Sequence, residues 1–211
     1  MEKAVLEKLD YFTLADLSNF YKNKQSALVH LNRAKKAWKI KKLRSGFYVW
    51  DLAVQKLVNS SQLTDFLEYV ATNVIYVPSY LSREYVLFKY GVLPENVYAF
   101  TLVSTKKTKT FKTDFGVFDY KHIKKDYFGD YRVIKKWRFW IYEASLEKAL
   151  WDWFYLKRGI VFEKSYFEEL RLNLEPVDLK EFEKIVKKYK VKKLEKVLDF
   201  LKELKNDSWR H

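Results

Sequence analysis

Four aspartates stand among lysines in the middle of the chain, and their carboxylates are the groups that could hold a catalytic metal ion. They are Asp114, Asp119, Asp126 and Asp130. A metal-dependent nuclease needs carboxylates close together with basic groups beside them, and Lys121 and Lys125 could supply the latter. The same aspartates also suit turns and solvated strand faces. We expect this second role and keep a metal-dependent nuclease only as a lesser alternative.

The other reactive residue types form no catalytic or cofactor pattern. Three histidines, His30, His122 and His211, lie far apart in the sequence, and no two have the spacing of metal ligands. The sequence contains no cysteine, no Gly-x-Ser-x-Gly nucleophile elbow and no glycine-rich phosphate loop. We therefore predict that the protein uses neither a metal nor a cofactor.

Side chains suited to DNA contact gather between residues 25 and 44. They are Gln25, Ser26, Arg33, Lys36, Lys41, Lys42 and Arg44. Amide, hydroxyl and guanidinium groups read base edges in a major groove, whereas lysines mainly bind phosphates. We predict that Gln25, Ser26 and Arg33 face a major groove and that Lys36 lies nearer the phosphates. The last three residues are predicted to grip DNA from a hairpin.

Two short helices must position the first four of these side chains. Thr13 is a natural N-cap, and Asp16 completes a weak capping box three residues later. The apolar stripe of this first helix is Leu14, Leu17, Phe20 and Tyr21, and residues 22–24 form a turn. The second helix is predicted from about Gln25 to Ala37. Its apolar side comprises Ala27, Leu28, Leu31, Ala34 and Trp38.

A basic hairpin follows these helices. Apolar and charged residues alternate over residues 38–43, a turn is expected at residues 44–46, and a second strand covers residues 47–50. Two helices and then a basic hairpin are the order of a winged helix-turn-helix. The alternative is a small helical module that only packs against a partner and carries ordinary solvated lysines.

The net charge supports a polyanionic partner and concentrates at the N-terminal end. The formal charge is +14, and residues 1–50 hold eleven Lys and Arg against four Asp and Glu. Half of the excess therefore falls in about a quarter of the chain, which is where we expect nucleic acid to bind. A second basic cluster consists of Lys106, Lys107, Lys109 and Lys112. It suits either a solvated loop or a further contact for DNA, RNA or an acidic partner.

The remaining sequence predicts an α+β arrangement, with an N-terminal winged helix-turn-helix over residues 1–52 and a mixed α/β domain over 60–211 that ends in two helices. A separate helix is expected before these two, at Ala4 to Leu9. A short strand is expected at Val74 to Val77, then a helix capped by Ser79 or Ser82 and stopped by Gly91, and a strand at Val97 to Val103. Further expected elements are a hairpin turning at residues 114–116 and a strand pair, or one long bent strand, over 131–142. A helix is expected to open at Ala144-Ser145, and tail helices are expected at 179–189, capped by Asp178, and at 191–204.

Two segments of this second part resemble a known family. Residues 76–91, YVPSYLSREYVLFKYG, look like the "P-[AS]-Y-[IL]-S, helix, small-residue stop" segment of AbiEi-family antitoxins. Residues 144–152, ASLEKALWD, are similar to that family's "A-x-P-E-K-A-L-x-D" helix start, with Leu146 where the family usually has proline. Glu147, Lys148 and Asp152 within this element are expected to cap and pair inside a structural helix. Together with the winged-helix start, the likeness spans nearly the full length in the right order.

The resemblance implies a protein that is not an enzyme but a transcriptional regulator, which is also the antitoxin of a type IV toxin–antitoxin system. Such a protein binds inverted repeats in double-stranded DNA of its own promoter and represses its operon. Its C-terminal domain counters a nucleotidyltransferase-like toxin, with or without direct binding. A stand-alone winged-helix regulator with an interaction domain would have a similar sequence. Because no apolar run approaches the roughly 20 residues of a membrane span, we expect a cytoplasmic protein without a membrane partner.

Overall fold

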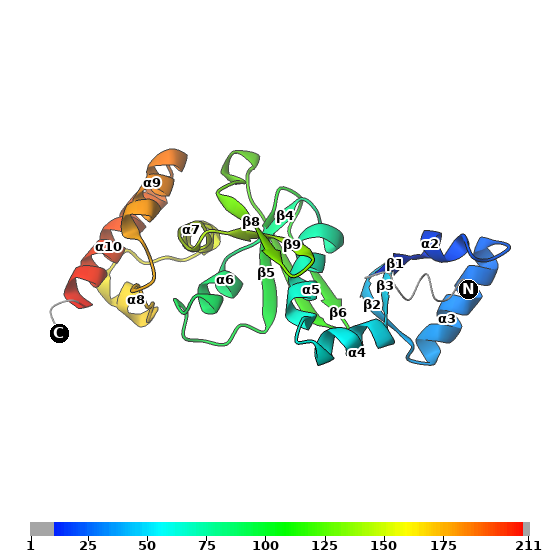
Figure 1. Ribbon diagram of the computed structural model, residues 1–211. Helices are drawn as coiled ribbons and strands as arrows, with labels where there is room; N and C mark the ends of the chain where they lie inside the picture. Colours follow the sequence, from blue (N-terminus) through cyan, green and yellow to red (C-terminus); the bar gives the residue numbers. More distant parts are fainter. Residues whose placement is uncertain (1–10, 209–211) are drawn as a thin grey trace.

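The computed structural model describes residues 11–208 and has an α+β fold (Figure 1). Its helices are α2 (Leu14–Ser18), α3 (Lys24–Lys36), α4 (Asp51–Asn59), α5 (Leu63–Val70), α6 (Glu84–Lys89), α7 (Leu146–Leu156), α8 (Lys164–Glu169), α9 (Leu179–Tyr189) and α10 (Lys192–Ser208). Its strands are β1 (Phe12–Thr13), β2 (Ile40–Arg44), β3 (Phe47–Trp50), β4 (Ser79–Leu81), β5 (Ala99–Ser104), β6 (Lys109–Thr113), β7 (Gly116–His122), β8 (Tyr131–Lys136) and β9 (Phe139–Ala144). A π-helical turn, η1 (Ala71–Ile75), and a 3-10 turn, η2 (Lys125–Tyr127), complete it. The helix predicted at Ala4 to Leu9 lies outside the described residues.

The N-terminal elements form because their caps and turn residues suit them. Thr13 and Asp16 make the predicted capping box at the start of α2, with the Thr13 amide 2.7 Å from an Asp16 carboxylate oxygen. Asn23 caps α3 by accepting from the Ser26 amide at 2.9 Å. Gly46, at φ 82°, provides the left-handed residue of the β2–β3 turn. The predicted hairpin is thus confirmed, and β1 adds to it in the order β1-β3-β2.

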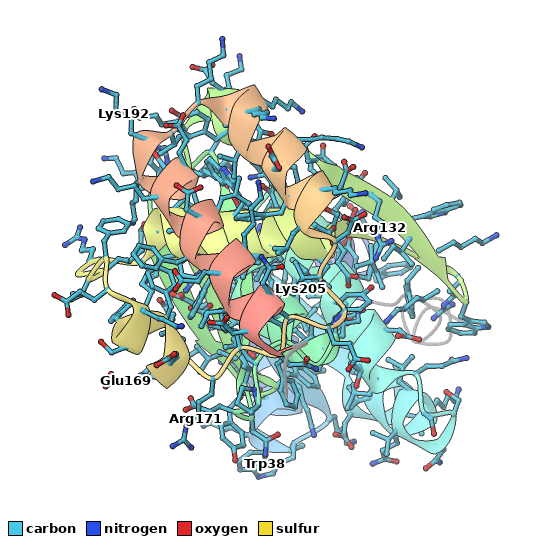
Figure 2. All side chains as sticks on the ribbon, turned by 90° about the vertical axis from the view of Figure 1, so that its left-hand side faces the viewer. Trp38, Arg132, Glu169, Arg171, Lys192 and Lys205 are labelled. Carbon is cyan, nitrogen blue, oxygen red and sulfur yellow. The ribbon has the colours of Figure 1, made fainter. Side chains whose placement is uncertain are left out.

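A small core holds α2 and α3 against this three-stranded sheet. It consists of Phe12, Leu17, Ala27, Leu31, Ala34, Ile40 and Trp50. The prediction that Trp38 joins this apolar side is wrong. α3 ends at Lys36, and Trp38 has φ 56°, so the chain turns away from the helix and leaves the side chain 85% exposed. Trp38 lies at the lower margin of the molecule in Figure 2.

A six-stranded mixed sheet forms the centre of the molecule. Its strand order is β6-β7-β5-β4-β9-β8, which leaves β6 and β8 as the two edges. Parallel pairs, β5 with β7 and β4 with β9, alternate with antiparallel ones. In Figure 1, α5 lies on the side of the sheet nearer α3, whereas α6 and α7 lie on the side nearer α9 and α10.

Two local predictions near residue 78 are wrong. Val74 to Val77 was expected to be a strand because β-branched residues favour strands. Val74 and Ile75 instead end the π-helical turn, where they are buried in the main core, and the strand begins after Pro78. Neither predicted serine caps α6, because Arg83 holds the N-cap position and Ser82 Oγ instead donates to Asp152 at 2.7 Å.

The C-terminal helices follow their predicted caps. Ser145 Oγ accepts from the Lys148 amide at the start of α7, and Asp178 accepts from two amides at the start of α9. Glu147, Lys148 and Asp152 point inward from α7 and are buried, as expected for a structural helix. The element that carries the family resemblance therefore belongs to the core.

Candidate nucleic-acid interface

One face of α3 carries the side chains predicted to contact DNA. Gln25, Ser26, Arg33 and Lys36 are all exposed, and so is Asn32 between them. The opposite side of the helix is held down by Ala27, Leu31 and Ala34, which are buried. Since side chains three and four positions apart share a face of a helix, this packing presents the donor-rich side to solvent.

Acidic side chains are absent from the sequence around this face. Between Asp16 and Asp51 the chain has nine Lys and Arg and no Asp or Glu. This stretch covers α3 and both strands of the hairpin. The positive potential is consequently not interrupted by a carboxylate of the same stretch, which favours the approach of a polyanion.

The three basic residues predicted on the hairpin occupy different environments. Lys42 is exposed, whereas Lys41 pairs with Asp51 at 3.4 Å. Arg44 is half-buried, with Nε donating to the Val74 carbonyl at 3.3 Å and its guanidinium 3.8 Å from the centre of the Phe47 ring. Lys42 is therefore the best placed of the three to meet a phosphate, and Arg44 mainly joins the hairpin to the central body.

The second basic cluster lies along one edge of the central sheet. Lys106 and Lys107 follow β5, and Lys109 and Lys112 are exposed on the edge strand β6. Lys106 Nζ is 5.2 Å from the centre of the Tyr76 ring, and Lys109 Nζ is 4.9 Å from that of Phe111. Cations beside aromatic rings suit both phosphate contact and base stacking.

The hairpin and this cluster meet at the turn between β6 and β7. The Lys42 amide donates to Asp114 Oδ2 at 2.7 Å, although the two residues are 72 positions apart. Lys41 Nζ lies 5.9 Å from the centre of the neighbouring Phe115 ring. Lys112 is on β6, two residues before Asp114. The two predicted basic groups are thus adjacent in space, which no local sequence signal revealed.

Three of the four aspartates considered for a nuclease are engaged with different partners. Asp114 binds the hairpin amide, and Asp130 accepts from Lys188 at 2.6 Å. Burial raises the pKa of Asp119, but hydrogen bonds from Thr110 and Arg83 outweigh it and hold this pKa below its ordinary value. Within residues 11–208 no three His, Asp or Glu side chains converge to hold a metal ion. The aspartates therefore give the nuclease alternative no support.

The two described histidines also lie apart. His30 packs its ring 5.1 Å from that of Tyr21, on the flank of α3. His122 Nδ1 is 3.1 Å from the Lys106 carbonyl at the end of β7. His211 is outside the described residues.

A buried ionic network between α5, α6 and β9 was not predicted. Lys89 bridges two carboxylates, Glu68 and Glu143, which are 1% and 0% exposed. Tyr85 Oη donates to Glu68 at 2.8 Å, and Tyr90 Oη donates to Glu143 at 2.7 Å. Burial and the adjacent Glu68 raise the pKa of Tyr85 above its ordinary value. The carboxylates are matched by donors, so the network fastens the sheet to its helices.

No protein-family model and no curated protein matches this sequence. None of the helices within residues 11–208 has both the length and the apolar character needed to cross a membrane.

Proposed function

We propose that this protein is a DNA-binding transcriptional regulator whose N-terminal part is a winged helix-turn-helix. The observation that carries the proposal is the exposed donor face of α3 beside a basic hairpin, in a stretch without Asp or Glu. In this proposal α3 enters a major groove, where Gln25, Ser26 and Arg33 meet base edges. Lys36 and Lys42 bind phosphates on either side.

We further propose that the regulator represses its own promoter as the antitoxin of a type IV system. This part is supported by the resemblance of residues 76–91 and 144–152 to AbiEi-family antitoxins. The buried Lys148 and Asp152 of the second segment would then preserve the fold, and an exposed surface of the central body would counter the nucleotidyltransferase-like toxin. Co-expression with such a neighbouring gene tests this role, and unrelieved growth arrest would contradict it.

DNA binding is tested with the DNA upstream of the gene and a scrambled duplex, across a salt series. Arg33→Ala is expected to cost about 1–3 kcal/mol on the upstream DNA and to relax specificity at one position. Lys42→Ala is expected to weaken both duplexes alike and to lower the salt slope by about one unit.

The matched control is Lys180→Ala on α9, which removes one exposed positive charge far along the chain from α3. It should leave both affinities unchanged. Equal losses on upstream and scrambled DNA for Arg33→Ala would remove α3 as the recognition helix. Equal weak binding of the unaltered protein to both duplexes would reduce the N-terminal part to a packing module.

A further inference from the structure

A cleft of about 1070 Å³ lies at the end of β7 opposite the turn that meets the hairpin. It is lined by the end of β7, the N-terminal end of α6, the end of α7 with the loop that follows, and the start of α10. Lys193 joins two of these walls by donating to the carbonyls of Tyr155 at 3.2 Å and Lys157 at 2.5 Å. Its neighbour Lys192, the first residue of α10, is labelled in Figure 2.

Positive charge dominates the lining of this cleft. The lining includes five Lys and Arg, namely Arg83, Lys121, Lys157, Arg158 and Lys193, against the single carboxylate of Glu84. Arg83 is neutralised by ion pairs with Asp119 at 3.0 Å and Glu84 at 3.1 Å, and Lys121 also pairs with Asp119 at 3.5 Å. Lys157 and Arg158 form no ion pair with a carboxylate of residues 11–208. An anionic ligand would therefore find unmatched cations here.

Aromatic rings lie beside these cations. Trp153 borders the cleft but is only 8% exposed, and Lys157 Nζ sits 4.7 Å from the centre of its ring. Phe162 is 37% exposed at the opposite end of the loop after α7. Flat apolar rings next to lysine and arginine are the combination that stacks bases while binding the phosphates between them.

The inner end of the cleft is built around a strained arginine. Arg83 has φ 61° and ψ −140°, a conformation that a residue with a Cβ rarely adopts. Its side chain is 9% exposed, and the ion pairs with Asp119 and Glu84 hold it in place. Backbone strain of this kind concentrates at ligand sites, where the surrounding contacts impose it.

We propose that this cleft binds nucleotide units, as a short single strand of nucleic acid. Lys157 and Arg158 would bind phosphates, and the exposed ring of Phe162 would stack a base. The volume lies at the upper end for small-molecule pockets and leaves room for more than one nucleotide. A duplex keeps its bases stacked on one another and would not offer them to the Phe162 ring. The site is distinct from α3 and does not depend on the proposed duplex binding.

The test measures the affinity of the full chain for fluorescein-labelled single-stranded decaadenylate and decauridylate by anisotropy, across a salt series. Lys157→Ala/Arg158→Ala should weaken binding about ten-fold or more and lower the salt slope by about 1.4, since each phosphate contact on a single strand contributes about 0.7. Phe162→Ala should weaken binding roughly ten-fold with little change in slope, because it removes a stacking surface and no charge. Both changes are at partly or fully exposed side chains, and a thermal melt checks that the fold is kept.

The matched control is Lys180→Ala/Lys184→Ala, which removes two exposed positive charges of α9 outside the cleft lining. It should bind both decamers like the unaltered protein. Arg33→Ala should also keep single-strand binding while losing upstream duplex, which separates this proposal from the preceding one.

Three results would overturn the proposal. The first is an equal loss of single-strand affinity in Lys157→Ala/Arg158→Ala and in the control Lys180→Ala/Lys184→Ala, which would mean that positive charge acts non-specifically. The second is no loss for Phe162→Ala and Lys157→Ala/Arg158→Ala. The third is full competition by decaglutamate, which would identify an acidic peptide as the ligand. Competition by AMP as strong as by decaadenylate would support the site and identify its ligand as a free nucleotide.

Discussion

The buried ion pair of α7 allows a sharp test of what holds the central body together. Lys148 and Asp152 are both 0% exposed, and Lys148 Nζ donates to Asp152 Oδ1. Asp152 Oδ2 accepts from Ser82 Oγ at 2.7 Å and from Tyr80 Oη at 3.1 Å. Burial raises the pKa of Asp152 and lowers the pKa of Lys148. Replacing Lys148 by Met therefore leaves a carboxylate without its cation in the core.

The cost of Lys148→Met can be approached in two ways. Removing one partner of a buried ion pair costs about 3–5 kcal/mol. Alternatively, Asp152 takes up a proton on folding, and protonating a carboxyl of ordinary pKa about 3.9 costs about 4 kcal/mol at pH 7. The two values agree, so we expect a loss of about 4 kcal/mol in the free energy of unfolding. For a chain of this length that is a fall of about 8–16 °C in the melting temperature.

The sign of the pH dependence follows from the same proton. In Lys148→Met the pKa of Asp152 is higher in the folded state than in the unfolded state. The variant is therefore destabilised progressively as the pH rises above about 4. At pH 5 the protonation cost is only about 1.5 kcal/mol, so the deficit against the unaltered protein should shrink by more than half.

Urea unfolding at pH 5 and pH 7, followed by tryptophan fluorescence, measures both effects. The exposed pair of Lys187 with Glu183 at 2.7 Å provides the control, and Lys187→Met should change stability by less than about 1 kcal/mol. Lys148→Met/Asp152→Asn should recover part of the loss and remove its pH dependence. A loss below about 1 kcal/mol for Lys148→Met, or a deficit that grows at pH 5, would refute this reasoning.

Three further predictions concern single contacts. Asp114→Ala removes the acceptor of the Lys42 amide and should cost about 1 kcal/mol, with faster hydrogen exchange at that amide; unchanged exchange would contradict the contact. Trp38→Ser should change the free energy of unfolding by less than about 0.5 kcal/mol because the ring is 85% exposed, and a loss above about 1 kcal/mol would mean that the ring packs. The lowered pKa of Asp119 stabilises the fold above about pH 4, and this stabilisation is lost as the pH falls. In urea unfolding, Asp119→Asn should therefore lose less unfolding free energy at acidic pH than the unaltered protein does, and an equal loss would contradict this reasoning.

Local signals predicted the elements whose ends are set by neighbouring residues. Thr13, Ser145 and Asp178 were expected at helix starts, and all three accept from the helix amides there. A cap acts within three or four residues, so the sequence alone contains the whole interaction. The alternation around Gly46 predicted the hairpin for the same reason.

Predictions failed where contacts between residues far apart in the sequence determine the structure. Val74 and Ile75 favour a strand by type but are buried as part of the π-helical turn. The sequence placed the two basic groups in separate parts of the chain, whereas the contact of Lys42 with Asp114 makes them neighbours. The cleft escaped prediction because Arg83, Lys121 and Arg158 come from three separate elements. No periodicity relates such positions.

The hairpin's two faces explain how α3 is held relative to the central body. Ile40 and Trp50 face the small core under α3, whereas Leu43 and Val49 are 0% exposed and belong to the main core. Successive strand residues point to opposite faces, so neighbours such as Val49 and Trp50 enter different cores. A hairpin buried on both faces cannot turn freely, and its movement would disturb both cores. The direction in which α3 presents Arg33 is therefore fixed by the buried residues on both faces of the hairpin.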